Sequence, residues 1–278
     1  MKWPDTILMV SPRGYRVEYA INPFMKDAQG RLKQVDAAKA EAQWKQIKGL
    51  YEKLGLTVEV LDGDSTFPDM VFCANQCFPF IDKNGRKSVV LSRMRSPERQ
   101  GEVRHFGVWA ESKGYQVHAI TDCFFEGCGD ALWNFETGEV FGGIGPRTEA
   151  RAYDQLEKII GQSVHRLKLC DPNFYHMDTC LSILNKNTAA YVEAAFNQEG
   201  RALLKQKFSN LIPIKMNEAL ECFAGNCFSP NGKDVLLHPG ATDLTANLRQ
   251  LGFTIHEINT SEFLKAGGSV FCMKQTLF

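Results

Sequence analysis

The sequence of 278 residues has no excess of charge of either sign. It contains 32 lysines and arginines against 32 aspartates and glutamates, and its isoelectric point is about 7.0. Nucleic acids and anionic membrane surfaces attract basic proteins, so we expect neither as a partner. No apolar run approaches the roughly 20 residues that a membrane-spanning helix needs. The first residues also lack the apolar core and cleavage site of a signal peptide, which favours a cytoplasmic location.

The sequence also lacks a Cys-x-x-Cys pair, although it contains nine cysteines. The closest cysteines are separated by three or four other residues, and no suitably spaced histidine pair accompanies them. Common zinc sites have a different spacing. We therefore expect no metal site and no cofactor. Most of the cysteines should be buried core residues in a reducing compartment.

Four stretches of the sequence share one pattern: a short polar residue, an apolar segment, a turn and a second apolar segment. They cover residues 68–93, 125–147, 174–196 and 219–240, with the polar anchors Asn75, Asp130, Asp178 and Asn226. The anchors recur about every fifty residues, which is typical of a repeat architecture. Asn84-Gly85 and Asn231-Gly232 are strong β-hairpin signals. Each stretch is therefore predicted to contain a hairpin.

A helix-like segment and a further strand-like segment follow each hairpin. The helical patterns cover residues 96–114, 148–161, 197–208 and 241–252, and a fifth pattern at 35–55 lies upstream. In that first helix, Trp44, Ile47, Leu50, Tyr51 and Leu54 fall at helical spacing and predict a buried face. The predicted fold class is α/β, with five ββαβ units in one domain over residues 1–278. The fifth hairpin should pair residues 5–12 with residues 267–273, which closes the units into a ring without free sheet edges.

Cys272 is a candidate nucleophile, because ring closure would bring it to the centre where the anchors of the units converge. A free cysteine is more often a buried core residue, and that alternative stays open. A cysteine nucleophile needs a base and an orienting group, which can lie far apart in the sequence. His176 and Glu126 belong to anchor hairpins and fit these roles, although an isolated histidine is more often structural. Carboxylates such as Asp178 suit a planar cation, whereas Asp130 is equally consistent with a backbone cap.

The motifs INP, PDMVF-x-AN, EG-x-GD, HMDT and GGSV-x-C, in this order, resemble those of the guanidino-group modifying enzymes. This superfamily includes arginine deiminases, agmatine deiminases, amidinotransferases and dimethylarginine dimethylaminohydrolases. Its fold is the pentein, a five-bladed α/β propeller, which agrees with the predicted repeat. The resemblance covers essentially the whole chain. The motifs are individually weak but jointly specific, because their order also fits.

The resemblance implies a role for each matching residue. Cys272 matches the nucleophile, His176 the general acid and base, and Glu126 the carboxylate that holds and polarises the site. The positions implied to bind substrate are Asn22, Asp69, Phe72, Asn75, Arg93, Arg147 and Asp178. The expected partner is therefore a small guanidino compound, arginine or a derivative.

Several of these roles are specific. Asp178 resembles the aspartate that binds the guanidinium, and Phe72 an aromatic residue that packs on the guanidinium face. Asp69 resembles a residue that binds the substrate α-amino group. Arg93 and Arg147 resemble arginines that bind the substrate carboxylate, although a solvated surface arginine is the alternative for both.

Two departures from the family pattern point to a subgroup. Dimethylarginine hydrolases usually have lysine where this chain has Asp178, and arginine deiminases usually have aspartate at Asn75 and are longer. Asn22 and Asn75, together with the catalytic pair, resemble the arginine dihydrolases, which convert arginine to ornithine, two ammonia and carbon dioxide. In some relatives a nucleotide-binding domain follows, and we expect none here because the sequence ends first.

Other activities stay open. A hydrolase similar to arginine deiminase or dimethylarginine dimethylaminohydrolase would stop at citrulline, and an amidinotransferase would need an amine acceptor. The same fold also occurs as a ribosome-binding module without catalysis. Such a module would not need Cys272, His176 and Glu126 together, so their joint presence favours an enzyme. The sequence does not indicate an oligomeric state.

Overall fold

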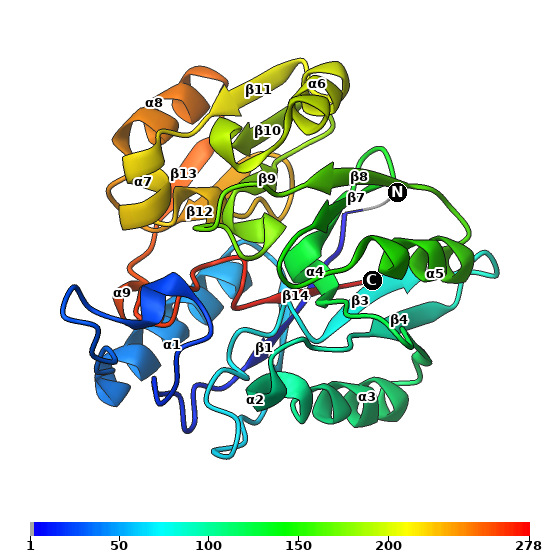
Figure 1. Cartoon of the computed structure of the whole chain (residues 1–278), viewed down its shortest axis with the longest axis horizontal. Helices are drawn as coiled ribbons and strands as arrows, with labels where there is room; N and C mark the ends of the chain where they lie inside the picture. Colours follow the sequence, from blue (N-terminus) through cyan, green and yellow to red (C-terminus); the bar gives the residue numbers. More distant parts are fainter. Residues whose placement is uncertain (1–2) are drawn as a thin grey trace.

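The computed structural model describes residues 3–278, and in it five small mixed β-sheets surround a common centre, with the longer helices outside them (Figure 1). Four of these sheets have three strands and one has two, counted over residues 3–278. In every sheet, a helical crossover leads to a strand that pairs in parallel with the strand before the helix. This is the predicted five-unit α/β arrangement.

The first sheet has the order β14–β1–β2 and joins the two ends of the chain. Its elements are β1 (Thr6–Val10), the short 3-10 helix η1 (Pro23–Met25), α1 (Ala37–Lys53), β2 (Thr57–Leu61) and β14 (Gln275–Leu277). Asp36 caps α1 by accepting a hydrogen bond from the Lys39 amide. Trp44, Ile47 and Tyr51 are buried, and Leu50 and Leu54 are partly buried against the same core, which confirms the predicted apolar face of this helix.

The next three sheets each consist of an antiparallel hairpin, a helix and a parallel third strand. Their strands are β3 (Cys77–Ile81), β4 (Lys87–Leu91), β5 (Gln116–Ala119), β6 (Ala131–Asn134), β7 (Glu139–Ile144), β8 (Val164–Lys168), β9 (Leu181–Ile183), β10 (Thr188–Tyr191) and β11 (Asn210–Pro213). The helices are α2 (Pro97–Gln100), α3 (Val103–Ser112), α4 (Gly127–Asp130), α5 (Ala150–Ile160), η2 (Met177–Thr179), η3 (Glu193–Ala195) and α6 (Gln198–Lys207). Apolar side chains fill the space between sheet and helix. Val140 on β7 and Leu156 on α5, for example, are fully buried in one cluster.

The last sheet departs from the predicted pattern, because its hairpin has only one full strand. Its elements are α7 (Met216–Glu221), η4 (Ala224–Asn226), β12 (Asp234–Leu237), α8 (Thr242–Gln250) and β13 (Thr254–Glu257). The expected first strand is reduced to a single bridge between Phe228 and Leu236. Pro230 follows closely and has no amide proton, so it cannot extend the ladder toward the turn.

The two ends of the chain pair as predicted, but the predicted bounds of the last strand are wrong. β14 pairs with β1 in antiparallel register, with Thr276 opposite Ile7. Residues 267–273 instead follow α9 (Ser261–Leu264) as a series of turns. The amide of Met273 donates to the Ser269 carbonyl, and the amide of Lys274 donates to the Phe271 carbonyl. Amides used in turns cannot join a ladder, so Cys272 lies in a turn just before β14.

The anchor turns of neighbouring units are joined to one another by hydrogen bonds at the centre. The five contacts, donor first, are Cys128 N to Ala74 O at 2.8 Å, Met177 N to Asp130 Oδ1 at 2.9 Å, Asn226 Nδ2 to Asp178 O at 2.9 Å, Cys272 N to Asn226 Oδ1 at 3.2 Å and Ala74 N to Cys272 O at 3.1 Å. The last contact returns to the turn that begins the series. The anchor turns therefore form a closed ring, and Cys272 is part of it.

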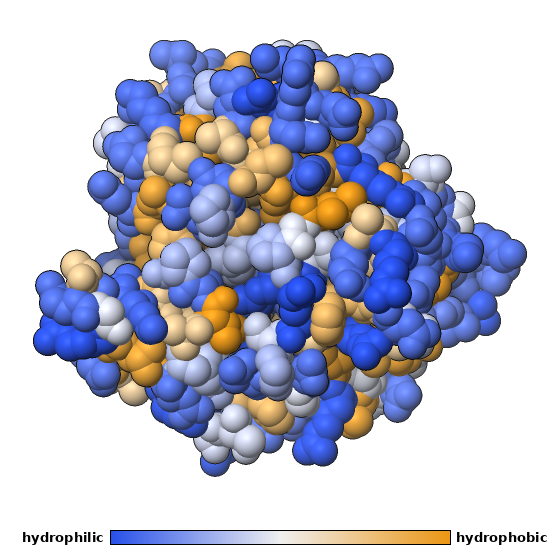
Figure 2. Space-filling view, viewed as in Figure 1, coloured by the Kyte–Doolittle hydropathy of each residue, from blue (hydrophilic) through white to orange (hydrophobic). Residues whose placement is uncertain are grey.

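Most of the outer surface on the side shown in Figure 2 is hydrophilic, and hydrophobic residues occur there in smaller groups. Among residues 3–278, no helix combines the length and the apolar character that a membrane span requires.

A substitution at Gly225 in η4 would test how closely the turns pack at the centre. A Cβ there would lie 2.2 Å from the backbone oxygen of Thr179, and backbone cannot easily move away. Gly225→Ala is therefore expected to lower the free energy of unfolding by about 1–3 kcal/mol, measured by urea denaturation. Gly49→Ala, in α1 with no atom within 4 Å, is the matched control and should raise the free energy of unfolding by about 0.5–1 kcal/mol. Equal effects of the two substitutions would contradict the proposed packing.

Candidate active site

A cavity lies beside the ring of anchor turns. Seven of the ten predicted site residues line it: Asn22, Asp69, Phe72, Asn75, Arg147, His176 and Cys272. They come from the N-terminal segment, from three anchor turns that are far apart in the sequence and, for Arg147, from the loop between β7 and α5. The cavity therefore brings the predicted thiol and imidazole to one place.

Cys272 is held by neighbours on both sides of its sulfur. Its Sγ donates to Asp178 Oδ2 at 3.1 Å and accepts from Asn226 Nδ2 at 3.1 Å. Burial, and after it the nearby carboxylate of Asp178, raise the pKa of the Cys272 thiol well above its usual value. With these neighbours alone the thiol stays protonated at neutral pH, so formation of the thiolate needs a nearby cation.

Asp178 is fully buried and does not have the pKa of an ordinary aspartate. Burial raises the pKa of Asp178 to about 7, although the hydrogen bond from Cys272 partly opposes this effect. Its second oxygen, Oδ1, has no hydrogen-bond partner within residues 3–278. A buried acceptor without a donor is costly, and a cationic N–H group would satisfy it.

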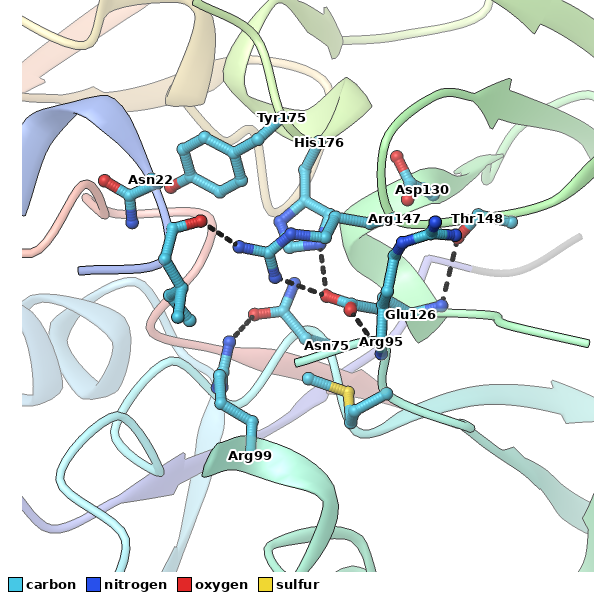
Figure 3. A network of polar contacts seen from close by, with 12 residues as sticks. Asn22, Asn75, Arg95, Arg99, Glu126, Asp130, Arg147, Thr148, Tyr175 and His176 are labelled. Carbon is cyan, nitrogen blue, oxygen red and sulfur yellow. Dashed lines mark hydrogen bonds and ion pairs between the residues drawn. The ribbon is translucent and has the colours of Figure 1, made fainter. Parts of the chain in front are cut away.

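His176 is oriented by Glu126, as Figure 3 shows. His176 Nε2 lies 2.6 Å from Glu126 Oε2, which also accepts from Arg147 Nη1 at 3.1 Å. The other oxygen accepts from the Arg95 backbone amide at 2.9 Å. Burial alone would raise the pKa of Glu126, but Arg147 and His176 outweigh it and lower the pKa to about 2. Glu126 is therefore ionised and fully engaged behind His176, and it does not itself line the cavity.

Arg147 lines the cavity, but much of its guanidinium is already engaged. In addition to Glu126, it donates to the backbone oxygen of Ile21 at 2.8 Å, and it lies 5.4 Å from the centre of the Tyr175 ring. Its predicted contact with a substrate carboxylate stays a prediction.

Arg93 is not among the residues that line the cavity, and its predicted contact with a substrate carboxylate stays a prediction. Arg93 is exposed, and its guanidinium lies 5.7 Å from the centre of the Phe124 ring. Its backbone forms an antiparallel bridge with Phe125. In extended backbone, side chains alternate between faces. Because Ser92 and Met94 on either side are buried, Arg93 points outward.

Asn22 and Asp69 both line the cavity. Asn22 accepts from the Phe24 amide and donates to the Ala266 carbonyl, both at 2.9 Å. This residue therefore ties the N-terminal segment to the loop before Cys272. Asp69 Oδ1 has no hydrogen-bond partner among the described residues. Burial raises the pKa of Asp69, and the charge of Arg99 offsets part of the rise.

Two cavity residues with polar side chains, Tyr175 and Arg99, escaped the sequence reasoning. Tyr175 donates its hydroxyl proton to the backbone oxygen of Gly267. Arg99, on α2, is buried and donates from Nη1 to Asn75 Oδ1 at 2.9 Å. In the sequence, Arg99 and Glu102 form an i,i+3 charge pair, which is the ordinary pattern of an exposed helix face. The only sign of a special role for Arg99 in the sequence was its position. It belongs to a charged pair directly after Pro97, where the hairpin segment ends and the helix begins.

Metal ligands do not gather in the part of the chain that the structure describes. His, Cys, Asp and Glu form no group of three or more there that could hold a metal ion.

Comparisons with known proteins converge on one family. Residues 15–278 match the family model described as eukaryotic N,N dimethylarginine dimethylhydrolase. The N(G),N(G)-dimethylarginine dimethylaminohydrolase of Mycobacterium tuberculosis is 37% identical, over 95% of this chain and 83% of that protein. The bifunctional arginine dihydrolase/ornithine cyclodeaminase AgrE of Nostoc is 35% identical over 96% of this chain, which spans 37% of that longer protein.

A solved structure gives the same result in three dimensions. The N-terminal domain of ArgZ, an arginine dihydrolase from the ornithine-ammonia cycle in cyanobacteria, was crystallised bound to substrate. It superposes with a TM-score of 0.90 at 31% identity, and the match covers 98% of this chain and 97% of that one.

The contact between Asp178 and the thiol predicts how fast Cys272 reacts. Asp178→Asn removes a charge that holds the thiol pKa up, so iodoacetamide should label Cys272 several-fold faster at pH 8, above the Asp178 pKa of about 7. Peptide mass spectrometry follows each cysteine separately, with exposed Cys170 as the internal reference. Asp154→Asn, on the exposed face of α5, is the matched control. Unchanged or slower labelling of Cys272 in Asp178→Asn would contradict this account.

Proposed function

The chain belongs to the dimethylarginine dimethylaminohydrolase and arginine dihydrolase family of pentein enzymes, and from this premise we propose that it hydrolyses arginine in two steps. Enzymes of this family hydrolyse C–N bonds of amidine groups, so the chain is a guanidino hydrolase and not a ribosome-binding module. The proposed overall reaction converts arginine and two water molecules to ornithine, two ammonia and carbon dioxide. One catalytic domain over residues 1–278 carries it.

The observation that carries the proposal is the combination of a Cys–His cavity with a neutral amide at Asn75. Asp178 does not itself line the cavity, but it contacts Cys272, which does, and its unpaired oxygen suits a guanidinium N–H group. At Asn75, a carboxylate would favour a cation over a neutral ligand. An amide carries no such preference, so the neutral product of a first hydrolysis can stay bound and react again.

In the first step, the bound guanidinium supplies the positive charge that the buried thiol needs. His176 accepts the proton of the Cys272 thiol, and the thiolate attacks the central guanidinium carbon. The C–S bond forms, His176 gives a proton to one amino group, and ammonia departs as its C–N bond breaks. The product on the enzyme is a thiouronium adduct. Water, activated by His176, then attacks the same carbon, the C–S bond breaks, and citrulline forms.

In the second step, the same residues act on the ureido carbon of citrulline. Cys272 attacks again, a second ammonia departs, and an S-carbamoyl adduct remains. Water releases it as the carbamate of ornithine, which loses carbon dioxide. Glu126 keeps the imidazole oriented through both rounds, because its low pKa holds it ionised.

A one-step hydrolase is the competing function, since the mycobacterial relative at 37% identity is named a dimethylarginine dimethylaminohydrolase. That enzyme name describes release of dimethylamine from a methylated guanidine. The product of turnover separates the two functions directly.

The decisive experiment counts ammonia. Incubation with arginine should yield two ammonia per ornithine, with citrulline only as a transient species in mass spectra. Cys272→Ser should abolish turnover and leave the protein folded. One ammonia per citrulline would reject the two-step proposal, as would turnover confined to N-methylated arginines.

Asn75→Asp tests the role of the neutral amide. The added negative charge should favour the cationic substrate over neutral citrulline, so citrulline should accumulate and ornithine should fall at least about tenfold. Chromatography of the products against time measures both. Asn84→Asp, in an exposed hairpin turn, is the matched control and should leave the product ratio unchanged. Unaltered ornithine formation by Asn75→Asp would contradict this role.

A further inference from the structure

We propose that Arg99 is a positioning residue that fixes which end of the Asn75 amide faces the cavity, and that this orientation lets the site hold the ureido group of citrulline. The inference rests on the proposed function and assigns its product specificity to a residue outside the catalytic set.

Arg99 lines the cavity next to Asn75 and holds the turn that carries Asn75. Its Nη1 donates to Asn75 Oδ1 at 2.9 Å, and its Nη2 donates to the backbone oxygens of Asp69 and Phe72, both at 3.1 Å. Three groups of one anchor turn are thus bound to a single planar guanidinium. Such a fork has a fixed geometry, so it sets the position of the turn and of the amide together.

The chemistry of arginine leaves only one orientation for the Asn75 amide. A guanidinium has five N–H donors and no acceptor, so the atom facing Arg99 must be Oδ1. The amide nitrogen therefore points the other way, toward the side of His176 and Arg147 (Figure 3). Nδ2 has no hydrogen-bond partner within residues 3–278, although Asn75 is buried and lines the cavity.

Gly129 shows how closely this nitrogen is packed beside the imidazole. A Cβ at Gly129 would lie 2.3 Å from Asn75 Nδ2 and 3.3 Å from ring carbons of His176. Only glycine leaves room for both groups. A buried donor without a partner is costly, so it needs an explanation. An acceptor on the reacting ligand provides one.

The ligand that matches an N–H donor is not the guanidinium. A guanidinium presents only donors to the site, whereas the ureido group of citrulline presents a carbonyl oxygen. After thiolate attack the central carbon is tetrahedral, and the lone pairs of its nitrogen atoms are no longer delocalised. These nitrogens can then accept a hydrogen bond from Asn75 Nδ2. Asn75 Nδ2 therefore complements the tetrahedral species and citrulline better than it complements arginine. An oxygen in its place would have the opposite preference.

The interaction that holds Arg99 is a fully buried ion pair with Glu102. Arg99 Nε donates to Glu102 Oε1 at 3.0 Å and Nη2 donates to Oε2 at 2.9 Å, while Gln76 Nε2 donates to Oε2 at 2.5 Å. Buried ion pairs contribute little net stability compared with apolar packing. The pair is therefore explained by the geometry that it imposes on Asn75 and not by its contribution to folding.

The test measures binding without turnover, in the Cys272→Ala background. Arg99→Gln with Glu102→Gln removes both charges of the pair together, and glutamine at position 99 can accept as well as donate, so the Asn75 amide can rotate. Calorimetry should show that the Kd for citrulline rises about tenfold or more relative to the Kd for arginine. Glu102→Gln alone is the matched control. It keeps a donor-only arginine against Asn75, and the Kd ratio should stay within about threefold.

An unchanged Kd ratio in the double variant would overturn the proposal, as would an equal shift in Glu102→Gln alone. If the double variant does not fold, the intact Cys272→Ala chain still decides. Citrulline should shift the side-chain amide proton resonances of Asn75, identified by their loss in Asn75→Ser, more than arginine does. Equal shifts, or none, would overturn the inference.

Failure of the proposed function would give a different result from failure of this inference. If the parent enzyme makes one ammonia and stops at citrulline, the two-step reaction is rejected, but the Kd ratio still reports the orientation of Asn75.

Discussion

The closed ring of hydrogen bonds between anchor turns is the constraint on which the rest of this structure depends. Five polar turns meet at the centre, and each must pair its buried backbone groups with a neighbour, because water does not reach them. The Asn226 side chain alone joins two turns, since it donates to the Asp178 carbonyl and accepts from the Cys272 amide. The cavity lies beside these junctions. Its residues are therefore positioned by contacts between units, and a shift in any one unit moves the others.

The ring also places two acidic side chains in opposite electrostatic situations. Glu126 lies against Arg147 and His176, so its pKa is about 2 and it stays ionised. Asp178 lies against a thiol, so burial dominates and its pKa is about 7. One carboxylate is thus a fixed anion that orients the imidazole. The other, together with the protonated thiol, forms a site that a cation would stabilise. Environments that separate the pKa values of like groups are a recurrent way to divide roles in catalysis.

The repeat predicted which turns meet at the centre, but not which of their side chains line the cavity, since Asp178 and Glu126 do not. Cys272, His176 and Asn75 all line the cavity, because the repeat brings every anchor to the centre. Arg93 does not, since the burial of Ser92 and Met94 decides on which face its side chain emerges. The last strand was placed too early for a similar reason. Turn hydrogen bonds in residues 267–274 compete with the ladder, and a hydrophobic pattern does not reveal which of them wins.

By itself, the sequence determined the five-unit α/β architecture, the pairing of the two chain ends and the identity of most cavity residues. The architecture and the pairing of the chain ends follow from local periodicity, turn chemistry and the spacing of the anchors, whereas cavity residues such as Phe72 and Arg147 were implied by the family resemblance. Only the tertiary structure decided that Arg99 is buried against Asn75, that Glu126 faces His176 and not the cavity, and which atom of the Asn75 amide is free. Each of these depends on the packing of side chains from distant segments, and donor and acceptor matching at such contacts has no signal in the order of residues.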